Sequence, residues 1–416
     1  MNLPPRLPAA AALAAIVALA TLGCAGPSGP HGRGAHAGPG GDAPEAAMQS
    51  QQRAFAARGY NPARQLTWHE QPVSLAAPTG VVRGILTRPD GSLARVPLVL
   101  YLPGLGEPAS AGERWRHAWA ASGVAVLSVQ LLDDDANAFR SDLARDGDFT
   151  ALGRQRYGDA AMRERLRALR AVLAEVRRRA DAREQPFAAI DAARIVVAGF
   201  DLGAYTAMVL AGEQVSAEGG PDPAGPMIAV LALSPFADVA AGGLETRYAG
   251  IRVPVLSITG DGDSDPLGLV RSPTQRQAPY AHIKAADNWL LWVYGLNHER
   301  LSGGELHAAA NAAPAREGDA VPAEPRGRSQ RGARERRGAG GNAGAGGGIG
   351  DARGAAPAAD PALALIAVEQ VSVAFLDALV QRDDLARNWL AGHAAGWLHG
   401  VGELHAARRG DAAALR

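Results

Sequence analysis

The sequence has few of the residues that cross-link proteins or attract charged partners. Cys24 is the only cysteine among 416 residues, which excludes an internal disulfide and a cysteine-rich zinc site. Acidic and basic residues balance at 42 each, so the net charge gives no indication of nucleic-acid binding. Aromatic residues make up 5% and hydrophobic residues 47% of the chain. We therefore expect a large core built mainly from alanine, leucine and valine.

The N-terminus has the layout of an export signal. Arg6 supplies a positive charge, and the apolar run over residues 7–22 is too short to span a bilayer comfortably. The run ends at Thr21-Leu22-Gly23-Cys24-Ala25. This ending resembles a bacterial lipobox, in which the cysteine is lipidated and becomes the new N-terminus, although leucine is usual where Thr21 stands. An ordinary cleaved signal with an incidental cysteine is the alternative.

Two observations favour lipidation of Cys24. This cysteine has no possible disulfide partner in the chain, and residues 25–52 are rich in glycine, proline and alanine without periodicity, as in a flexible tether. We predict a signal peptide over residues 1–24 and a tether over residues 25–64. No aspartate follows Cys24, which by resemblance favours the outer membrane. The expected location is therefore the cell envelope, with a lipid anchor in the outer membrane and the protein facing the periplasm.

Residues 65–308 show apolar runs of strand length that alternate with helical patterns. Strands are predicted over 66–75, 81–86, 96–102, 124–129, 194–198, 227–233, 253–259 and 289–294, and helices over 111–122, 162–176 and 204–210. The first two strands flank a turn and form a hairpin, and the acidic stretch 133–148 is expected to be irregular. This alternation predicts an α/β domain with a mostly parallel sheet of about eight strands flanked by helices.

Residues 309–360 interrupt this pattern. They are mostly alanine, glycine, arginine, proline and glutamate, a composition that cannot bury enough apolar surface to offset the entropy lost on ordering. We predict a disordered insertion, with the arginine cluster 326–337 as part of a solvated linker rather than a nucleic-acid site. After it, residues 361–407 are expected to form C-terminal helices that complete the domain, beginning with an amphipathic helix over 363–380.

The most informative motif is Gly199-Phe200-Asp201-Leu202-Gly203. It lies between a predicted strand and a predicted helix of small residues, which is the layout of a nucleophile elbow. Gly199 and Gly203 allow a sharp turn that passes close to its neighbours, and the central side chain projects over the edge of the sheet. Asp201 stands at that central position, where serine is common.

An acid and a histidine follow the elbow in the order that a catalytic triad requires. Asp263 comes just after the strand 253–259, in a segment that also contains Asp261 and Asp265 as rivals for the same role. His298 comes just after the strand 289–294. Active sites of open α/β sheets lie at these carboxyl ends of the strands. We therefore predict a site of Asp201, Asp263 and His298, with no metal and no cofactor.

These motifs resemble those of the α/β-hydrolase superfamily, in particular its dienelactone hydrolase-like and platelet-activating-factor acetylhydrolase-like members. The resemblance covers residues 65–308 and 361–390 and is carried by the segments 102–106, 199–207 and 297–304. It implies an oxyanion hole built from the backbone N–H groups of Leu105 and Leu202. The chain departs from the families at Pro103, where histidine is usual, and at Asp201, where serine or cysteine is usual.

An aspartate at an elbow changes the chemistry that the site can perform. A helix N-terminus stabilises the Asp201 anion, which needs no base to attack a saturated carbon and form an alkyl ester. Haloalkane dehalogenases and epoxide hydrolases of the superfamily work in this way, but they carry a cap domain. Here only about twenty residues separate the strands 227–233 and 253–259, too few for such a cap. Attack on an ester carbonyl would form an anhydride, which is energetically unfavourable.

Three roles therefore remain for Asp201: a nucleophile, a general base that aligns water together with His298, or a residue of an inactive site. We predict an exported or lipid-anchored hydrolase that acts on an ester, lactone or related bond of a small-molecule substrate. The alternative is a catalytically decayed binding protein of the cell envelope. Besides the substrate, the expected partner is the membrane, and no nucleic acid is expected.

Overall fold

The computed structural model describes residues 42–78, 80–91, 95–215, 227–303 and 360–407. Its contacts divide the chain into two units, Met1–Met48 and Gln49–Arg416. The described part of the first unit is only the beginning of helix α1 (Asp42–Arg58). The predicted signal peptide with Cys24 and residues 309–359 of the predicted insertion lie outside the described residues.

A mixed sheet of nine strands forms the centre of the second unit, in the order β1-β2-β4-β3-β5-β6-β7-β8-β9. The strands are β1 (Trp68–Ala77), β2 (Gly80–Pro89), β3 (Val96–Leu102), β4 (Ala125–Val129), β5 (Ile190–Phe200), β6 (Met227–Leu233), β7 (Val255–Gly262), β8 (Asn288–Asn297) and β9 (Gly402–Ala406). Strands β3 to β8 pair with one another in parallel, whereas β1, β2 and β9 pair antiparallel at the two edges of the sheet.

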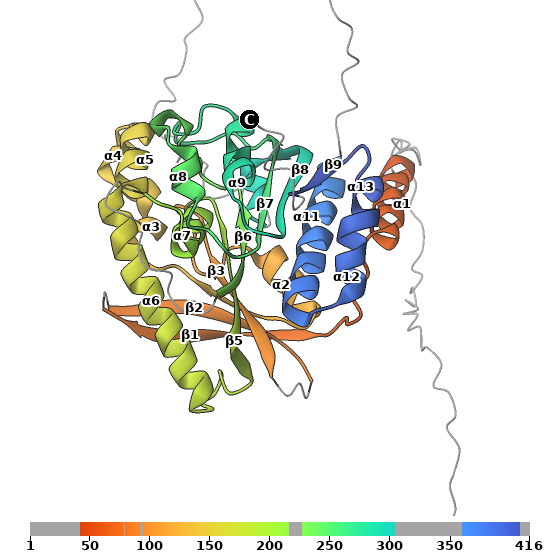
Figure 1. Ribbon diagram of the computed structural model, residues 1–416, viewed down its shortest axis with the longest axis horizontal. Coiled ribbons are helices and arrows are strands. Elements are labelled where there is room, and N and C mark those ends of the chain that lie inside the picture. Colours follow the sequence, from red (N-terminus) through yellow and green to blue (C-terminus); the bar gives the residue numbers. More distant parts are fainter. Residues whose placement is uncertain (1–41, 79, 92–94, 216–226, 304–359, 408–416) are drawn as a thin grey trace, which may run out of the picture. The chain divides into compact units, whose positions relative to one another are not determined.

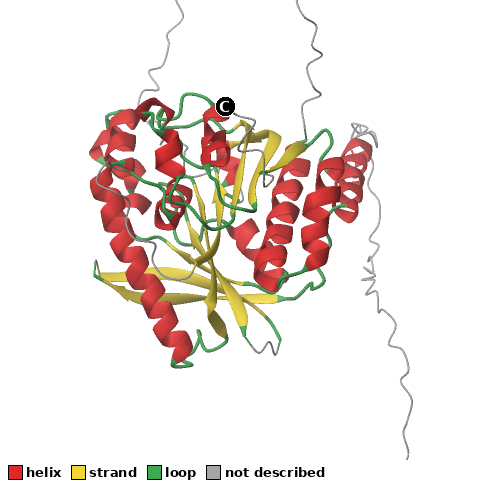
Figure 2. Ribbon diagram, viewed as in Figure 1, coloured by secondary structure: helices red, strands yellow, loops and turns green. Residues whose placement is uncertain are grey.

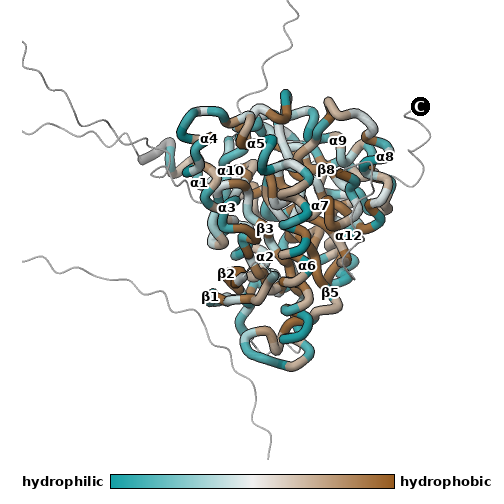
Figure 3. The backbone as a smooth tube through the Cα atoms, turned by 90° about the vertical axis from the view of Figure 1, so that its left-hand side faces the viewer, coloured by the Kyte–Doolittle hydropathy of each residue, from teal (hydrophilic) through white to brown (hydrophobic). Residues whose placement is uncertain are grey.

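Helices cover both faces of this sheet. Helices α2 (Glu113–Ala121) and α11 (Pro361–Leu376) pack on one face, and α6 (Asp159–Asp181) and α7 (Leu202–Ala211) pack on the other (Figures 1 and 2). Strand β3 is buried throughout because its side chains alternate between the two cores: Leu98, Leu100 and Leu102 face α6 and α7, and Val99 and Tyr101 face α2 and α11. In Figure 3 the strands are largely hydrophobic, whereas hydrophilic and hydrophobic residues alternate along α6.

This architecture is the α/β-hydrolase fold and confirms the predicted fold class. The chain between β6 and β7 forms only a short 3₁₀ turn (Val239–Ala241) and helix α8 (Leu244–Tyr248), so residues 234–254 contain no large cap. Strand β9 was not predicted, because its residues Gly402–Ala406 form an exposed edge strand without an apolar run.

The C-terminal part is more apolar than an amphipathic surface helix. Residues Pro361–Gln381 are long and apolar enough to cross a membrane, but 72% of the apolar 18-residue window within them is buried inside the structure. Its composition therefore fits a core helix that packs on β8 and α2. After it come the π-turn Asp377–Gln381, α12 (Asp384–Asn388), the π-turn Trp389–His393 and α13 (Ala394–Trp397).

The predicted tether is wrong for residues 49–60. Helix α1 continues to Arg58, and Phe55 is buried with its ring stacked 4.4 Å from that of Trp397. Tyr60 is also buried, and its hydroxyl donates to Asp377 Oδ2 at 2.9 Å. The sequence does not show this helix because it has no apolar stripe, only isolated aromatic residues that pack on the C-terminal helices. Residues 25–41 of the predicted tether lie outside the described residues.

The acidic stretch 133–148 is not irregular. It forms α3 (Asp133–Ala136), a 3₁₀ turn (Ala138–Arg140) and α4 (Asp142–Arg145), and α5 (Phe149–Tyr157) follows. The carboxylates and hydroxyls that suggested a loop act as caps: Ser141 accepts from the N–H of Ala144, and Asp148 from that of Ala151. We call residues 133–157 the helical segment, because it lies beside the site described next.

Candidate active site

The elbow places Asp201 between the end of β5 and the start of α7. Its backbone has φ 52° and ψ −112°, a strained conformation for a residue with a side chain. A Cβ at Gly203 would lie 1.9 Å from the carbonyl oxygen of Leu102, and one at Gly199 would lie 2.3 Å from the carbonyl carbon of Gly203. Both glycines are therefore required sterically, as the sequence predicts for a tight strand-to-helix turn.

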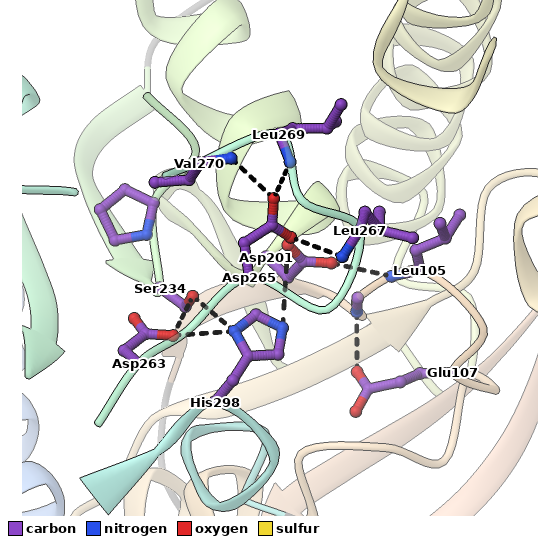
Figure 4. A network of polar contacts seen from close by, with 12 residues as sticks. Leu105, Glu107, Asp201, Ser234, Asp263, Asp265, Leu267, Leu269, Val270 and His298 are labelled. Carbon is purple, nitrogen blue, oxygen red and sulfur yellow. Dashed lines mark hydrogen bonds and ion pairs between the residues drawn. The ribbon is translucent and has the colours of Figure 1, made fainter. Parts of the chain in front are cut away.

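The structure brings Asp201, His298 and Asp263 together, as Figure 4 shows. Asp263 directly follows β7, and His298 begins the short helix α10 (His298–Leu301) after β8. His298 Nδ1 lies 2.8 Å from Asp263 Oδ1, and His298 Nε2 lies 4.0 Å from Asp201 Oδ1. Because a carboxylate only accepts hydrogen bonds, Nδ1 carries the proton toward Asp263, and Nε2 faces Asp201.

The rival acids have other partners. Asp261 accepts the backbone N–H of Gly295 at 2.7 Å. Asp265 accepts three backbone N–H groups of the loop that follows it, those of Leu267, Leu269 and Val270. Of the three aspartates that the sequence left open, only Asp263 contacts His298.

The protonation of the pair follows from its surroundings. Burial disfavours the Asp263 anion, but its hydrogen bond with His298 and the charge of Arg276 hold the pKa of this carboxyl below its ordinary value. Burial likewise disfavours the charged form of His298, but the hydrogen bond with Asp263 and the charge of Asp201 raise the pKa of the imidazole. The arrangement therefore stabilises an imidazolium, the form that His298 takes after it accepts a proton.

One of the two predicted oxyanion-hole donors is in contact with Asp201 itself. The N–H of Leu105 donates to Asp201 Oδ2 over a long distance of 3.4 Å. Leu202 is the first residue of α7, where helical N–H groups have no intrahelical partner. Asp201 Oδ2 thus accepts the N–H of Leu105, which is predicted to stabilise an oxyanion, and Asp201 Oδ1 faces His298.

Tyr157 is a site residue that the sequence analysis missed. Its hydroxyl donates to Asp201 Oδ1 at 2.5 Å, and its ring packs against those of Tyr205 and Phe236. Burial and the negative charge of Asp201 raise the pKa of Tyr157 well above its ordinary value, so it remains a hydrogen-bond donor at neutral pH. No sequence motif marks it, because it ends a short helix far from the elbow in the chain.

Ser234 and Arg276 were also missed. Ser234 Oγ donates to Asp263 Oδ1 at 2.9 Å and lies 3.0 Å from His298 Nδ1, in a backbone with φ 52°. Arg276 is 1% exposed; its Nε donates to the carbonyl of Asp263 and lies 3.5 Å from Asp263 Oδ2. The position of Ser234 directly after β6 is a usable signal, since sites gather at strand ends. Arg276 lies in a loop turn and has no such signal.

Glu107 lies beside the turn that carries Leu105. Its Oε2 accepts the N–H of Gly104 at 2.7 Å (Figure 4). Burial raises the pKa of Glu107 to about 7, against the lowering effect of the Gly104 hydrogen bond, and the nearby negative charge of Asp201 adds to the increase. The folded protein therefore holds a proton on Glu107 at a pH where an exposed glutamate has lost it.

This difference predicts a pH-dependent stability. Because the folded pKa of Glu107 is raised from 4.5 to about 7, its contribution to stability is complete below pH 4.5 and is lost as the pH rises through 7. We expect Glu107→Gln, which keeps the oxygen that accepts the Gly104 N–H, to gain about 3 kcal/mol relative to the wild type between pH 4.5 and pH 8. Urea unfolding of both proteins at several pH values measures this gain. If the free energies of unfolding of the two proteins differed by the same amount at every pH in that range, the raised pKa of Glu107 would be contradicted.

The parts of the chain that the structure describes contain no group of three or more His, Cys, Asp or Glu side chains placed to hold a metal ion.

No protein-family model and no curated protein sequence matches this chain. Among solved structures, the chain is similar to a dienelactone hydrolase from Anabaena variabilis, with 18% sequence identity and a TM-score of 0.38. The match covers 56% of this chain and 89% of that one. A likeness at this level says nothing about substrate or mechanism, and the strand order and connections described above establish the fold.

Proposed function

We propose that this chain is a hydrolase of ester, lactone or related bonds, in which Asp201, His298 and Asp263 carry the reaction. The observation that carries the proposal is the continuous series of contacts from Asp201 Oδ1 through His298 to Asp263. The triad and the finer resemblance to dienelactone hydrolase-like proteins are part of this proposal.

The first step uses Asp201 as a nucleophile toward saturated carbon. Asp201 Oδ1 attacks the alkyl carbon of the substrate, the carbon–oxygen bond breaks, and the leaving oxygen takes the electron pair as a carboxylate or alkoxide. The hydrogen bond from Leu105 to Oδ2 orients the attacking carboxylate. Attack at this carbon yields an alkyl ester of Asp201, whereas attack at the carbonyl would yield an anhydride.

The second step hydrolyses this ester. A water molecule attacks Asp201 Cγ, His298 Nε2 takes its proton, and Asp263 stabilises the imidazolium. The N–H of Leu105, together with that of Leu202, stabilises the negative charge that develops on the carboxyl oxygen. Collapse expels the substrate alkoxide, which takes the proton from His298 and leaves as an alcohol. Asp201 then contains one oxygen atom from water.

Labelling with ¹⁸O tests this pathway. The protein is given ester, lactone, epoxide and haloalkane substrates in H₂¹⁸O, and the peptide containing Asp201 is examined by mass spectrometry. Turnover should place ¹⁸O in the Asp201 carboxylate. Turnover without label would exclude the nucleophile and leave the general-base role, in which Asp201 and His298 align the water. The same peptide from protein incubated in H₂¹⁸O without substrate is the control.

A binding protein with an inactive site is the second candidate. It is favoured by two observations: Asp201 is only 6% exposed, and both of its carboxylate oxygens already accept hydrogen bonds, from Tyr157 and Leu105. Absence of turnover on all four substrate classes, together with retention of a cell-envelope ligand, would support this alternative.

The proposal places the protein in the cell envelope, exported and anchored to the outer membrane by a lipid on Cys24. It rests on the apolar run 7–22 and the lipobox-like residues around Cys24. Metabolic labelling with palmitate should mark the wild type and not Cys24→Ser; equal labelling of the two proteins would refute lipidation at this residue.

A further inference from the structure

Two exposed phenylalanines lie together on the helical segment. Phe139 is 45% exposed and Phe149 is 42% exposed, and their ring centroids are 6.4 Å apart. The other large hydrophobic residues exposed in the described part of the chain, Met48, Val81 and Leu385, are not aromatic. An exposed aromatic pair leaves apolar surface in water, which makes it a candidate binding surface.

Phe139 packs against the turn that contacts Asp201. A Cβ at Gly106 would lie 2.3 Å from a ring atom of Phe139, so the ring rests directly on this glycine. The preceding residue, Leu105, donates its N–H to Asp201, and the N–H of Gly106 donates to the carbonyl of Asp135 at 2.8 Å. The Phe139 ring is therefore one residue away from the predicted oxyanion-hole donor.

Phe149 and Tyr157 are the two ends of helix α5. Tyr157 donates to Asp201, so the axis of α5 leads from the exposed ring of Phe149 toward the reacting carboxylate over about 12 Å. Midway along α5, Gly153 packs against Leu269 and Leu267. The backbone N–H groups of these two leucines donate to Asp265. The two phenylalanines thus lie on the same segment that forms one wall of the site.

The helical segment is firmly held, so the exposure of these rings is a feature of the fold. Asp135 and Arg165 form a buried ion pair with contacts of 2.6 and 2.9 Å, and Ser141 and Asp148 cap the following helices. The helical segment contains six aspartates and four arginines. Arg145 pairs with Asp142, Arg156 with Asp134 and Arg165 with Asp135, so the charges beside the rings are largely compensated.

We propose that Phe139 and Phe149 form a platform that binds an uncharged apolar group of the substrate, an alkyl chain or an aryl ring, beside the carbon that Asp201 attacks. This substrate class rests on the proposed hydrolase function. The rings supply apolar contact area for this group.

The test measures binding of n-alcohols, which resemble the proposed product, to the full chain by isothermal titration calorimetry. For the wild type, each added methylene from butanol to octanol should tighten Kd by about twofold, roughly 16-fold in total, since a chain lying on the platform is buried on one side.

The variant Phe139→Ser/Phe149→Ser should lose this dependence on chain length, and Leu385→Ser, which removes another exposed side chain from α12, should keep it. Phe149→Ser alone serves if loss of Phe139 disturbs the turn at Gly106. An unchanged slope in the phenylalanine variants would overturn the proposal.

The outcome is separable from that of the proposed function. Chain-length-dependent binding without ¹⁸O in Asp201 would refute the nucleophilic mechanism and retain the platform. Incorporation of ¹⁸O into Asp201 together with binding that does not depend on chain length would support the nucleophilic mechanism and refute the platform.

Discussion

Asp201→Asn is expected to lower kcat by about 10⁴-fold or more, because the amide is a poor nucleophile and a poor base. The substitution keeps the shape of the side chain and one of its two hydrogen-bonding oxygens, so the fold should persist. Steady-state kinetics on any ester, lactone, epoxide or haloalkane that the protein hydrolyses measures the loss. Asp261→Asn is the matched control, because Asp261 contacts the N–H of Gly295 and not His298.

His298→Ala should have a different effect from Asp201→Asn. It removes the base of the second step and leaves the nucleophile of the first, so the alkyl ester of Asp201 should accumulate. Intact-protein mass spectrometry after addition of substrate would then show one alkyl group per chain. If Asp201→Asn retained activity within about tenfold of the wild type, Asp201 would be neither the nucleophile nor the base.

Arg165→Ala is expected to destabilise the protein by about 3–5 kcal/mol, the usual cost of leaving one member of a buried ion pair without its partner. Arg165 and Asp135 are 2% and 1% exposed, and the guanidinium also donates to the carbonyl of Arg156. The loss should appear as a lower midpoint of urea unfolding. Arg167→Ala, an exposed arginine on the same helix, should change the midpoint little.

The same pair connects stability with the site. Asp135 holds the helical segment through Arg165 and accepts the N–H of Gly106 through its carbonyl, and Tyr157 at the other end of the segment contacts Asp201. Replacing both members by apolar residues, Asp135→Leu/Arg165→Met, should recover much of the stability that Arg165→Ala loses. A double variant as unstable as Arg165→Ala would show that the ion pair itself is required.

The elbow could be predicted from sequence because its determinants are local. Gly199 and Gly203 are needed to avoid clashes within a few residues of Asp201, and the strand and helix on either side have clear apolar patterns. The long helix α6 was predicted for the same reason. Helix α1 was not, because one buried aromatic residue, Phe55, anchors it to distant Trp397.

The acid of the site shows where local reasoning ends. Asp261, Asp263 and Asp265 lie within five residues and have the same chemistry, so their spacing alone could not select one. The path of the chain after β7 places Asp263 in contact with His298, whereas Asp261 and Asp265 accept backbone N–H groups. Tyr157 contacts Asp201 and Arg276 contacts Asp263, both from segments that carry no motif.

The sequence by itself determined the α/β class, the sheet-forming segments apart from β9, and the elbow with an aspartate at its centre, because backbone sterics and hydrophobic periodicity act over a few residues. Only the tertiary structure decided what surrounds that aspartate: Tyr157 and Leu105 on its two oxygens, His298 at 4.0 Å, and the exposed pair Phe139 and Phe149 nearby. These contacts depend on how distant segments pack across the ends of the strands. The chemistry open to Asp201 is set by that packing.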